Sequence, residues 1–454
     1  MCPAHKTYIM RIPGNVTEEQ AASGKLHWWQ RIGPGLVTAC VVIGPGSILT
    51  SSNLGAKDGY SMIWVVLVSV IFMLVYTSLG ARLGTVTTES TCTLLAQMVG
   101  RPLTILIGCG VFFISAAYQF GNNLGVHSAL ENYTDFKYGI VIFNAISIAF
   151  LFGFKNLYKL VERLMSVFVA VMLASFAINL FFAKPDLTEM AQGVIPGSGE
   201  GGLKSITDIS LLGLIGTTFV ITAAFYQSYL ARFKGWKIKD LKDGRIDACI
   251  SASIMALITI MIMSTAAAVL RGMTLTSVAD VGNALQPLFG DKGQILFCIG
   301  LFSAAYSSFI VNSMIGGFIL SDSLGLGGTP QDKSTRILTA AVLLTGMFVA
   351  LYVIESGTKP VAAIVAAQAV TVVAAPLAAG ALLLLTSSKK IMGDYRNGPV
   401  INLFAGIGFV LLLGMAWYIA TEKVIPQINS MRSESAAVEI IPQPEMNLVL
   451  QKLS

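Results

Sequence analysis

The sequence predicts an all-α integral membrane protein with about 11 transmembrane helices. Of its 454 residues, 54% are hydrophobic and only 12% are charged, which is about half the charged share of an ordinary soluble domain. The mean hydropathy of +0.73 over the whole chain leaves no room for a large soluble domain. Long apolar stretches recur along the chain, and each has roughly the 20 residues that a helix needs to cross a bilayer.

Eleven apolar segments meet that length requirement. We expect them near residues 34–54, 60–81, 104–130, 138–154, 158–183, 208–231, 246–270, 293–321, 337–354, 361–386 and 399–421. They divide the chain into an N-terminal segment (1–32), a transmembrane domain (33–421) and a C-terminal tail (422–454). The tail carries prolines among mixed charges, which is typical of disorder. The N-terminus shows no short apolar run followed by a cleavage site, so we expect no removable signal peptide.

The basic residues are distributed unevenly between the two sides of the predicted membrane domain. The N-terminal segment and the loops after the even-numbered segments carry 20 of the 30 lysines and arginines. This bias places the N-terminus in the cytoplasm and, with 11 crossings, the C-terminus outside, most simply at the plasma membrane. The basic cluster at residues 232–245 is better explained by such a cytoplasmic loop than by a nucleic-acid or lipid site.

Neither the cysteines nor any motif indicates an enzyme. The six cysteines are scattered, without the close pairs that hold a metal, and most lie in or beside apolar segments, where a free cysteine usually packs. The sequence shows no nucleotide-binding, hydrolase or redox motif. We therefore expect no cofactor and no enzymatic activity.

The first apolar segment is interrupted by Gly44-Pro45-Gly46-Ser47. Proline removes a backbone donor and glycine is a poor helix former, so a helix is expected to open here and expose carbonyls and amides. Within a membrane, such groups are tolerated only where they face a cavity or other protein groups. The tetrapeptide therefore predicts a ligand site in a transporter, although none of its side chains is charged.

Several stretches of the chain resemble the NRAMP family of divalent-metal transporters. They are the opening of the first segment, with Gly33-Pro34-Gly35-Leu36 and the Gly-Pro-Gly break, and residues 81–87, 306–317, 368–376 and 386–393. These stretches occur in the family's order and cover roughly residues 30–400. The resemblance implies a leucine-transporter-like fold, with inverted five-helix repeats at 33–183 and 208–386 and an extra helix at 399–421.

The resemblance also implies that the first helix of each repeat is broken at the membrane midplane and binds the substrate there. The family's ligand motifs are Asp-Pro-Gly-Asn in the first helix and Met-Pro-His in the sixth. In this chain the ligand positions are occupied by Gly44, Ser47, Val220 and Thr222. Without the carboxylate, thioether and imidazole, a preference for Mn²⁺ or Fe²⁺ is not expected, and the metal stays unknown.

The substrate site expected from these positions consists of small, polar and uncharged residues. The family position on the tenth segment that faces the substrate is retained as a glutamine. The predicted substrate-binding residues are Gly44, Pro45, Gly46, Ser47, Thr218, Val220, Thr222 and Gln368.

The third segment carries amides where the family usually has acidic residues associated with proton movement. Gln119, Asn122 and Asn123 either line the solute path or join helices by hydrogen bonds, and the sequence favours neither interpretation. His127 is the only histidine within an apolar segment. It is either a packing residue or a site of proton coupling.

Three functions remain open from the sequence. The first, implied by the resemblance, is secondary transport of a divalent cation, where a hydrated ion such as Mg²⁺ suits a neutral site better than Mn²⁺. The second is transport of a small organic solute such as an amino acid, whose carboxylate suits the start of an opened helix. The third is a sensor or regulator that does not transport. The expected partners are the bilayer and a small ion or molecule, with proton coupling open.

Overall fold

The computed structural model describes residues 33–131, 133–134, 136, 138–154, 156–197, 209–357 and 361–430. Within these ranges, the structure describes the backbone but not the side chains of residues 209–213, 288, 361–370, 372 and 423. The predicted N-terminal segment and the tail beyond Ser430 lie outside the described residues. In the part of the chain that is described, all regular secondary structure is helical, as the sequence predicts.

The helices follow one another in two sets of five spans and one additional span. The first set contains α2 (Pro34–Val42), α3 (Pro45–Asp58), α4 (Ile63–Val86), α5 (Thr91–Val99), α6 (Arg101–Leu130), α7 (Gly139–Gly153), α8 (Leu157–Ala183) and the short α9 (Leu187–Gln192). The second contains α10 (Ile209–Thr218), α11 (Ile221–Lys234), the 3-10 helix η3 (Ile238–Asp240), α12 (Leu241–Val269), α13 (Val278–Ser323), α14 (Lys333–Ser356) and α15 (Val361–Ser387). The chain continues through α16 (Lys389–Met392), the 3-10 helix η4 (Gly393–Tyr395), α17 (Pro399–Ile419) and the π-helical turn η5 (Ala420–Val424).

Each of the 11 predicted segments corresponds to one of these helices or helix pairs. Among the described residues, eight helices are long and apolar enough to cross a membrane, or nine if the bent pair α2–α3 counts as one span. Helix α7 and the Val373–Ser387 part of α15 are shorter apolar helices. The last span runs to Ser430, so the helix continues past the expected boundary at residue 421.

The first helix of each set is broken. Helices α2 and α3 meet at Ile43 and Gly44 with a bend of 58°. Helices α10 and α11 are separated by Phe219 and Val220. The second break contains no proline, so it was less evident in the sequence than the first.

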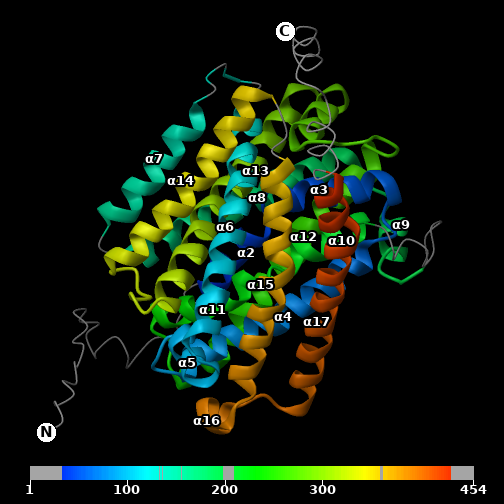
Figure 1. Ribbon diagram of the computed structural model, residues 1–454. Coiled ribbons are helices and arrows are strands. Elements are labelled where there is room, and N and C mark those ends of the chain that lie inside the picture. Colours follow the sequence, from blue (N-terminus) through cyan, green and yellow to red (C-terminus); the bar gives the residue numbers. More distant parts are fainter. Residues whose placement is uncertain are drawn as a thin grey trace, which may run out of the picture.

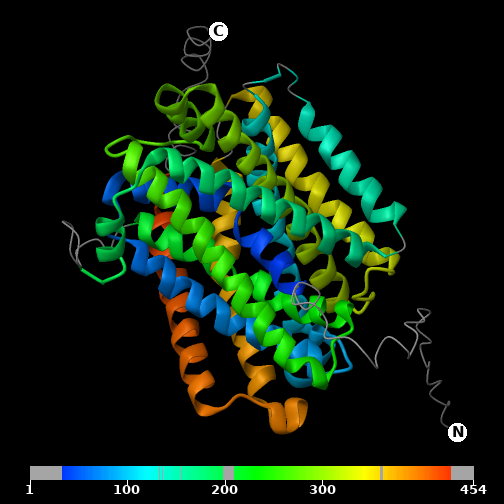
Figure 2. The ribbon, with the colours of Figure 1, turned by 180° about the vertical axis from the view of Figure 1, so that it is seen from behind.

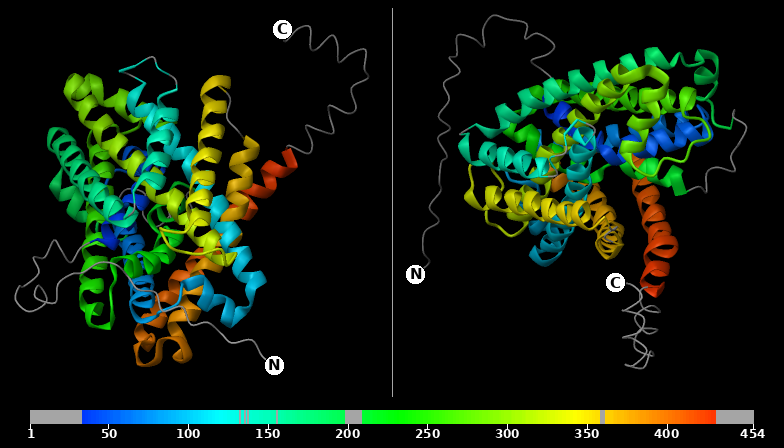
Figure 3. Two further views of the ribbon diagram at one scale, coloured as in Figure 1. Left: turned by 90° about the vertical axis from the view of Figure 1, so that its left-hand side faces the viewer. Right: turned by 90° about the horizontal axis from the view of Figure 1, so that it is seen from above.

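Connections between consecutive membrane spans lie at the two ends of the molecule. Helices α5 and α16 follow the second and tenth spans, and both lie at the lower end in Figure 1. Helix α17 rises from that end along one side of the molecule, as the views from behind and from above also show (Figures 2 and 3). The connections that follow the second and tenth spans therefore lie at the same end, as an alternating series of membrane crossings requires.

Glycines allow α4 to approach the second broken helix closely. Gly80 and Gly84 face α11. A Cβ added to Gly80 would lie 2.3 Å from the Ala224 carbonyl oxygen, and a Cβ added to Gly84 would lie 2.0 Å from the Ser228 carbonyl oxygen. This is the small-xxx-small spacing that brings membrane helices into backbone contact. Helix α11 is thereby held against α4 along about one turn.

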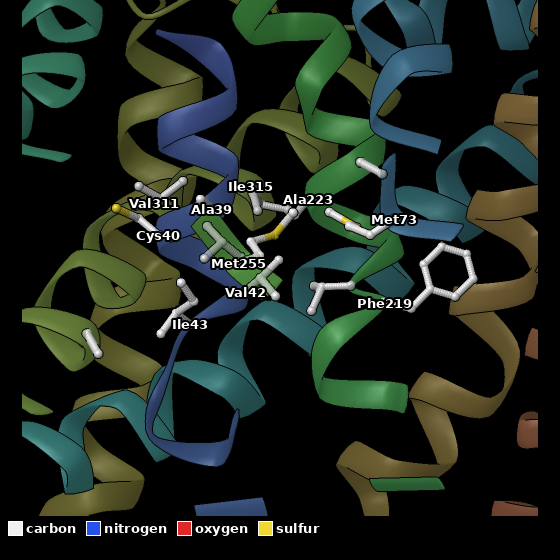
Figure 4. Close-up of a cluster of buried hydrophobic side chains, with 14 of the residues drawn as sticks. Ala39, Cys40, Val42, Ile43, Met73, Phe219, Ala223, Met255, Val311 and Ile315 are labelled. Carbon is white, nitrogen blue, oxygen red and sulfur yellow. The ribbon is translucent and has the colours of Figure 1, made fainter. Parts of the chain in front are cut away.

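The centre of the molecule is apolar around both breaks. Figure 4 shows one cluster of buried hydrophobic side chains that contains Val42 and Ile43 of the first break, Phe219 and Ala223 at the second, and Ile315 of α13. All five are buried. Polar groups at the breaks are consequently enclosed by hydrocarbon side chains, where an unsatisfied polar group costs free energy.

Candidate functional site

The break between α2 and α3 leaves carbonyl groups without their helical donors. In a continuous helix the Val41 carbonyl would accept from residue 45, but Pro45 has no N–H. The Cys40 carbonyl would accept from Gly44, whose N–H instead donates to the Val42 oxygen at 3.2 Å. Several carbonyl oxygens at the end of α2 are therefore available to other partners.

Ser47 connects the two broken helices. Its hydroxyl lies 2.5 Å from the Val42 carbonyl oxygen of its own span and 3.2 Å from the Thr217 carbonyl oxygen at the end of α10. In a continuous helix the Thr217 carbonyl would accept from residue 221, beyond the second break. One buried hydroxyl thus contacts a carbonyl from each break, and this contact defines the centre of the candidate site.

Ser308 of α13 contacts the other carbonyls of the first break. Its hydroxyl oxygen lies 2.6 Å from the Cys40 oxygen, 3.2 Å from the Val41 oxygen and 3.3 Å from the Ile43 oxygen. In the sequence, the stretch around Ser308 was notable only because residues 306–317 resemble a serine-rich helix of the NRAMP family. Its contact with the break depends on α13 packing against α2 and was not predicted.

Gly44 lies between α13 and α6. A Cβ at this position would be 3.1 Å from the Ser308 hydroxyl oxygen and 3.4 Å from the Asn122 side-chain oxygen. Gly44, Ser47 and Asn122 are all buried. Three predicted site residues are therefore brought together, and the oxygens that they meet are neutral.

The neighbours in the Gly-Pro-Gly sequence have different environments. Pro45 is buried, and a Cβ added to Gly125 of α6 would lie 2.2 Å from the Pro45 ring. Gly46 is exposed and faces the Thr217 side chain. Pro45 therefore packs against α6, whereas Gly46 borders solvent on the α3 side of the break.

The residues predicted at the second break are buried beside it. Thr218 ends α10. Val220 is the N-cap residue of α11, and its carbonyl accepts from the Ala223 and Ala224 amides. Thr222 lies in the first turn of α11, and its buried hydroxyl has no hydrogen-bond partner among the described residues. This hydroxyl is therefore available to a bound solute or to water.

The amides of α6 do not all converge on the break. Gln119 packs against α14, where a Cβ added to Gly346 would lie 2.6 Å from the Gln119 Cβ. Asn123 donates to the Gln119 carbonyl oxygen at 2.8 Å, and its own side-chain oxygen accepts from Asn144 of α7 at 2.8 Å. Asn122 therefore faces the site and Asn123 joins α6 to α7 by a hydrogen bond. The buried Gln119 amide has no hydrogen-bond partner among the described residues, so its role stays open.

His127 lies away from the break, in the last turn of α6. Its Nε2 atom is 3.7 Å from a Glu131 carboxylate oxygen, and its side chain is 22% exposed. The geometry places a carboxylate beside it near the end of a span. Gln368 lies on α15, and its side chain is outside the described residues.

No cluster of metal-binding side chains accompanies the break. Over the described ranges, no group of three or more His, Cys, Asp and Glu residues could hold a metal ion. The buried carboxylate of Asp247 in α12 instead accepts from the Gly33 and Gly35 amides at the start of α2. That end lies roughly 13 Å from the break, at 1.5 Å for each residue of the helix.

Comparison with known proteins agrees with the motifs and the broken-helix architecture. The family model described as natural resistance-associated macrophage protein-like matches residues 35–422. The chain belongs to the Nramp family. The two sets of five spans, each beginning with a broken helix, are the leucine-transporter-like repeats that the sequence resemblance implies.

Named relatives of this Nramp protein are transporters. It is 23% identical over 405 residues to a divalent metal cation transporter MntH of Deinococcus radiodurans, covering 86% of this chain and 89% of the relative. It is 26% identical over 432 residues to MntH of Bacillus subtilis, covering 90% of this chain and 97% of the relative. A solved mutant of the Eremococcus coleocola manganese transporter has the same fold, with a TM-score of 0.74 at 16% identity over 95% of this chain and 93% of that one.

Proposed function

We propose that this Nramp-family protein transports a divalent cation that keeps part of its water shell, with Mg²⁺ better suited than Mn²⁺. The observation that carries this proposal is the neutral set of oxygens at the break. Ser47, Asn122 and the backbone carbonyls of Val42 and Thr217 provide hydroxyl, amide and carbonyl oxygens. The names of the MntH relatives support a divalent cation as the class of cargo.

The selectivity follows from the chemistry of the ligands. Mn²⁺ and Fe²⁺ gain affinity and selectivity from imidazole, thioether and carboxylate ligands, but Gly44, Val220 and Thr222 occupy the corresponding positions here. Mg²⁺ loses its waters reluctantly and often binds through them. A neutral site that hydrogen-bonds to metal-bound water needs no direct charged ligand.

Membrane orientation and coupling form part of the same proposal. Helices α5 and α16, which follow the second and tenth spans, lie at the same end of the molecule (Figure 1). The excess of lysine and arginine in the N-terminal segment and in the loops after the even-numbered segments supports a cytoplasmic location for that end. We place the protein in the plasma membrane on this basis. Proton coupling through the first break would need a titratable group there, whereas the predicted coupling candidate His127 lies in the last turn of α6 beside Glu131.

An amino acid is a second candidate cargo, supported by the start of α3. This helix begins at Pro45 without a side-chain cap, and Gly46 in its first turn is exposed. The uncapped N-terminus of a helix attracts a carboxylate through its free N–H groups and its dipole. A solute with one carboxylate could bind there without a charged side chain.

Uptake into proteoliposomes distinguishes these cargoes. The purified protein would be reconstituted and tested with Mg²⁺, Mn²⁺ and a panel of amino acids. We expect Mg²⁺ uptake, with Ser47→Ala lowering it by about tenfold because the hydroxyl joining the breaks is lost. Ser313→Ala is the matched control, since this buried serine bonds within α13 to the Ile310 carbonyl at 2.7 Å.

Each other result of the uptake assay would support a different conclusion about the cargo. Saturable Mn²⁺ uptake at micromolar concentrations, with no Mg²⁺ uptake, would contradict the proposed selectivity. Amino-acid uptake without Mg²⁺ uptake would favour the second candidate. Absence of uptake for the whole panel, in a preparation that remains folded, would support the non-transporting function.

A further inference from the structure

An apolar crevice of about 350 Å³ lies between α7, α8, α13 and α14. None of the described residues that line it belongs to the two broken helices. Helices α8 and α14 both pack against α13, and α7 packs mainly against α14 and α6. In Figures 1 and 2, α7 lies at the edge of the molecule beside α14. The crevice is therefore bounded by an outer helix of the membrane domain and is separate from the candidate cargo site.

The walls of the crevice offer hydrocarbon surface. Most of the lining side chains are those of leucine, isoleucine, valine, methionine or phenylalanine. The lining hydroxyls belong to Ser147, Ser313 and Thr339, and each donates to a carbonyl oxygen of its own helix at 2.7–2.9 Å. A polar solute would lose its hydrogen bonds to water there without regaining them, whereas a hydrocarbon chain has none to lose. The walls therefore suit an apolar occupant.

The crevice begins near one end of the membrane domain and is open to the surroundings. Leu151 and Leu157 lie on either side of the short connection between α7 and α8. The wall formed by α8 continues from Leu157 to Leu164, a distance of roughly 10 Å along the helix. One leaflet of a bilayer has roughly 15 Å of hydrocarbon, half of the total core. Because Phe150, Leu160 and Leu164 are partly exposed, the crevice can receive an acyl chain from the bilayer.

Arg336 lies at the same end of the crevice. It is one turn before the lining residue Thr339 on α14. Its guanidinium donates at 3.3, 3.3 and 2.7 Å to the carbonyl oxygens of Phe152, Phe154 and Pro330. These bonds hold the guanidinium beside the end of α7 and use three of its five N–H groups. Two N–H groups can therefore still donate to a phosphate.

Two further cations lie beside the crevice on α8. Lys159 and Arg163 are both exposed, and they are one helical turn apart on either side of the lining residue Leu160. The carboxylate of Glu162 on the same helix is paired with Lys234. Its charge is therefore largely compensated, and Lys159 and Arg163 give this end of the crevice a positive potential.

We propose that the crevice binds one anionic phospholipid. One acyl chain would lie between α7 and α8, and the phosphate would contact Arg336, Lys159 and Arg163. Guanidinium groups bind phosphate oxygens through paired hydrogen bonds, and each lysine or arginine near the membrane surface favours anionic lipid. A zwitterionic phospholipid carries an additional positive charge in its head group and binds more weakly here. The inference goes beyond the proposed cargo, because lipid binding requires no transport.

Photo-crosslinking with a lipid probe tests the position of the acyl chain. The purified full-length protein would be reconstituted in phosphatidylcholine nanodiscs with a small amount of phosphatidylglycerol that carries a diazirine on one acyl chain. Mass spectrometry would then locate the labelled peptides. We expect labelling concentrated on the parts of α7, α8 and α14 that line the crevice. Added unlabelled phosphatidylglycerol should lower this labelling, whereas the same amount of phosphatidylcholine should not.

Substitutions that fill the crevice test whether it holds the chain. Leu164→Trp places a larger side chain at the partly exposed wall, and most of the labelling in the crevice should be lost. Ile178→Trp is the matched control, because Ile178 is an exposed apolar residue of the same helix, roughly 21 Å from Leu164. Labelling of the crevice should be unchanged in this control.

Charge substitutions test the head group. Lys159→Gln combined with Arg163→Gln should weaken competition by phosphatidylglycerol by about tenfold. Lys389→Gln combined with Lys390→Gln removes the same charge from two exposed residues of α16 and should leave the competition unchanged. Labelling spread evenly over all lipid-facing helices, equal competition by the two lipids, or equal effects of the two double variants would overturn the inference. Failure of cation uptake would leave these lipid results unchanged.

Discussion

Replacing Asp247 should release the start of α2 from α12. The Asp247 side chain is completely buried. Its carboxylate accepts from the Gly33 amide at 2.8 Å, the Gly35 amide at 2.7 Å and Gln227 Nε2 at 3.3 Å. Two of these donors are backbone groups at the N-terminus of α2, where the helix dipole also favours a negative charge. Asp247 therefore holds the first broken helix at the end opposite its break.

The size of the effect follows from the three donors. Hydrogen bonds to a charged group contribute about 1.5–3 kcal/mol each, but the desolvation cost of the carboxylate offsets part of that sum. Asp247→Ala leaves three buried donors without an acceptor, and we expect a loss of about 3–5 kcal/mol. Asp247→Asn keeps one acceptor oxygen and the shape of the side chain, so its cost should be about 1–2 kcal/mol.

Two measurements test this prediction. Thermal unfolding in detergent reports the stability, with Asp243→Asn on the same helix as a partly exposed control expected to change it by less than about 1 kcal/mol. Maleimide labelling followed by mass spectrometry reports the position of α2, because Cys40 is fully buried on that helix. Cys40 should react faster in Asp247→Ala. Wild-type stability together with an unreactive Cys40 in that variant would refute the reasoning.

Two other predictions concern the metal site and helix packing. Isothermal titration should show that the wild type binds Mn²⁺ with a dissociation constant above the micromolar range. The triple variant Gly44→Asp, Ser47→Asn, Val220→Met should bind Mn²⁺ at least about tenfold more tightly, because these changes restore charged and soft ligands. Micromolar binding of Mn²⁺ by the wild type would contradict this prediction. Gly84→Ala should destabilise the fold by about 1–3 kcal/mol in thermal unfolding because its Cβ would lie 2.0 Å from the Ser228 carbonyl oxygen. Gly406→Ala, where a Cβ meets nothing within 4 Å, is its control, and equal stability of the two variants would argue against the close approach of α4 and α11.

The sequence alone determines the class of the protein, its helical segments and the first break. Hydrophobic runs of membrane-spanning length must form helices, because a bilayer offers backbone groups no other partner. The Gly-Pro sequence at residues 44–45 interrupts one of these helices by local chemistry, since proline lacks the N–H that the Val41 carbonyl needs. The motifs also predict that Gly44, Ser47, Val220 and Thr222 stand at the family's ligand positions, and this stays a prediction.

Only the tertiary structure decides which polar side chains meet at that break. Asn122 faces Gly44 whereas Gln119, one turn earlier on α6, contacts α14, and helical periodicity alone could not choose between them because both neighbours are apolar helices. Ser308 and Asp247 reach α2 from more than 200 residues away in the chain, so no local pattern marks them as partners. The second break, at Phe219 and Val220, has no proline, so no residue there marks it as Pro45 marks the first. Contacts of this kind arise from the arrangement of whole helices, which satisfies backbone groups that the local sequence leaves without partners.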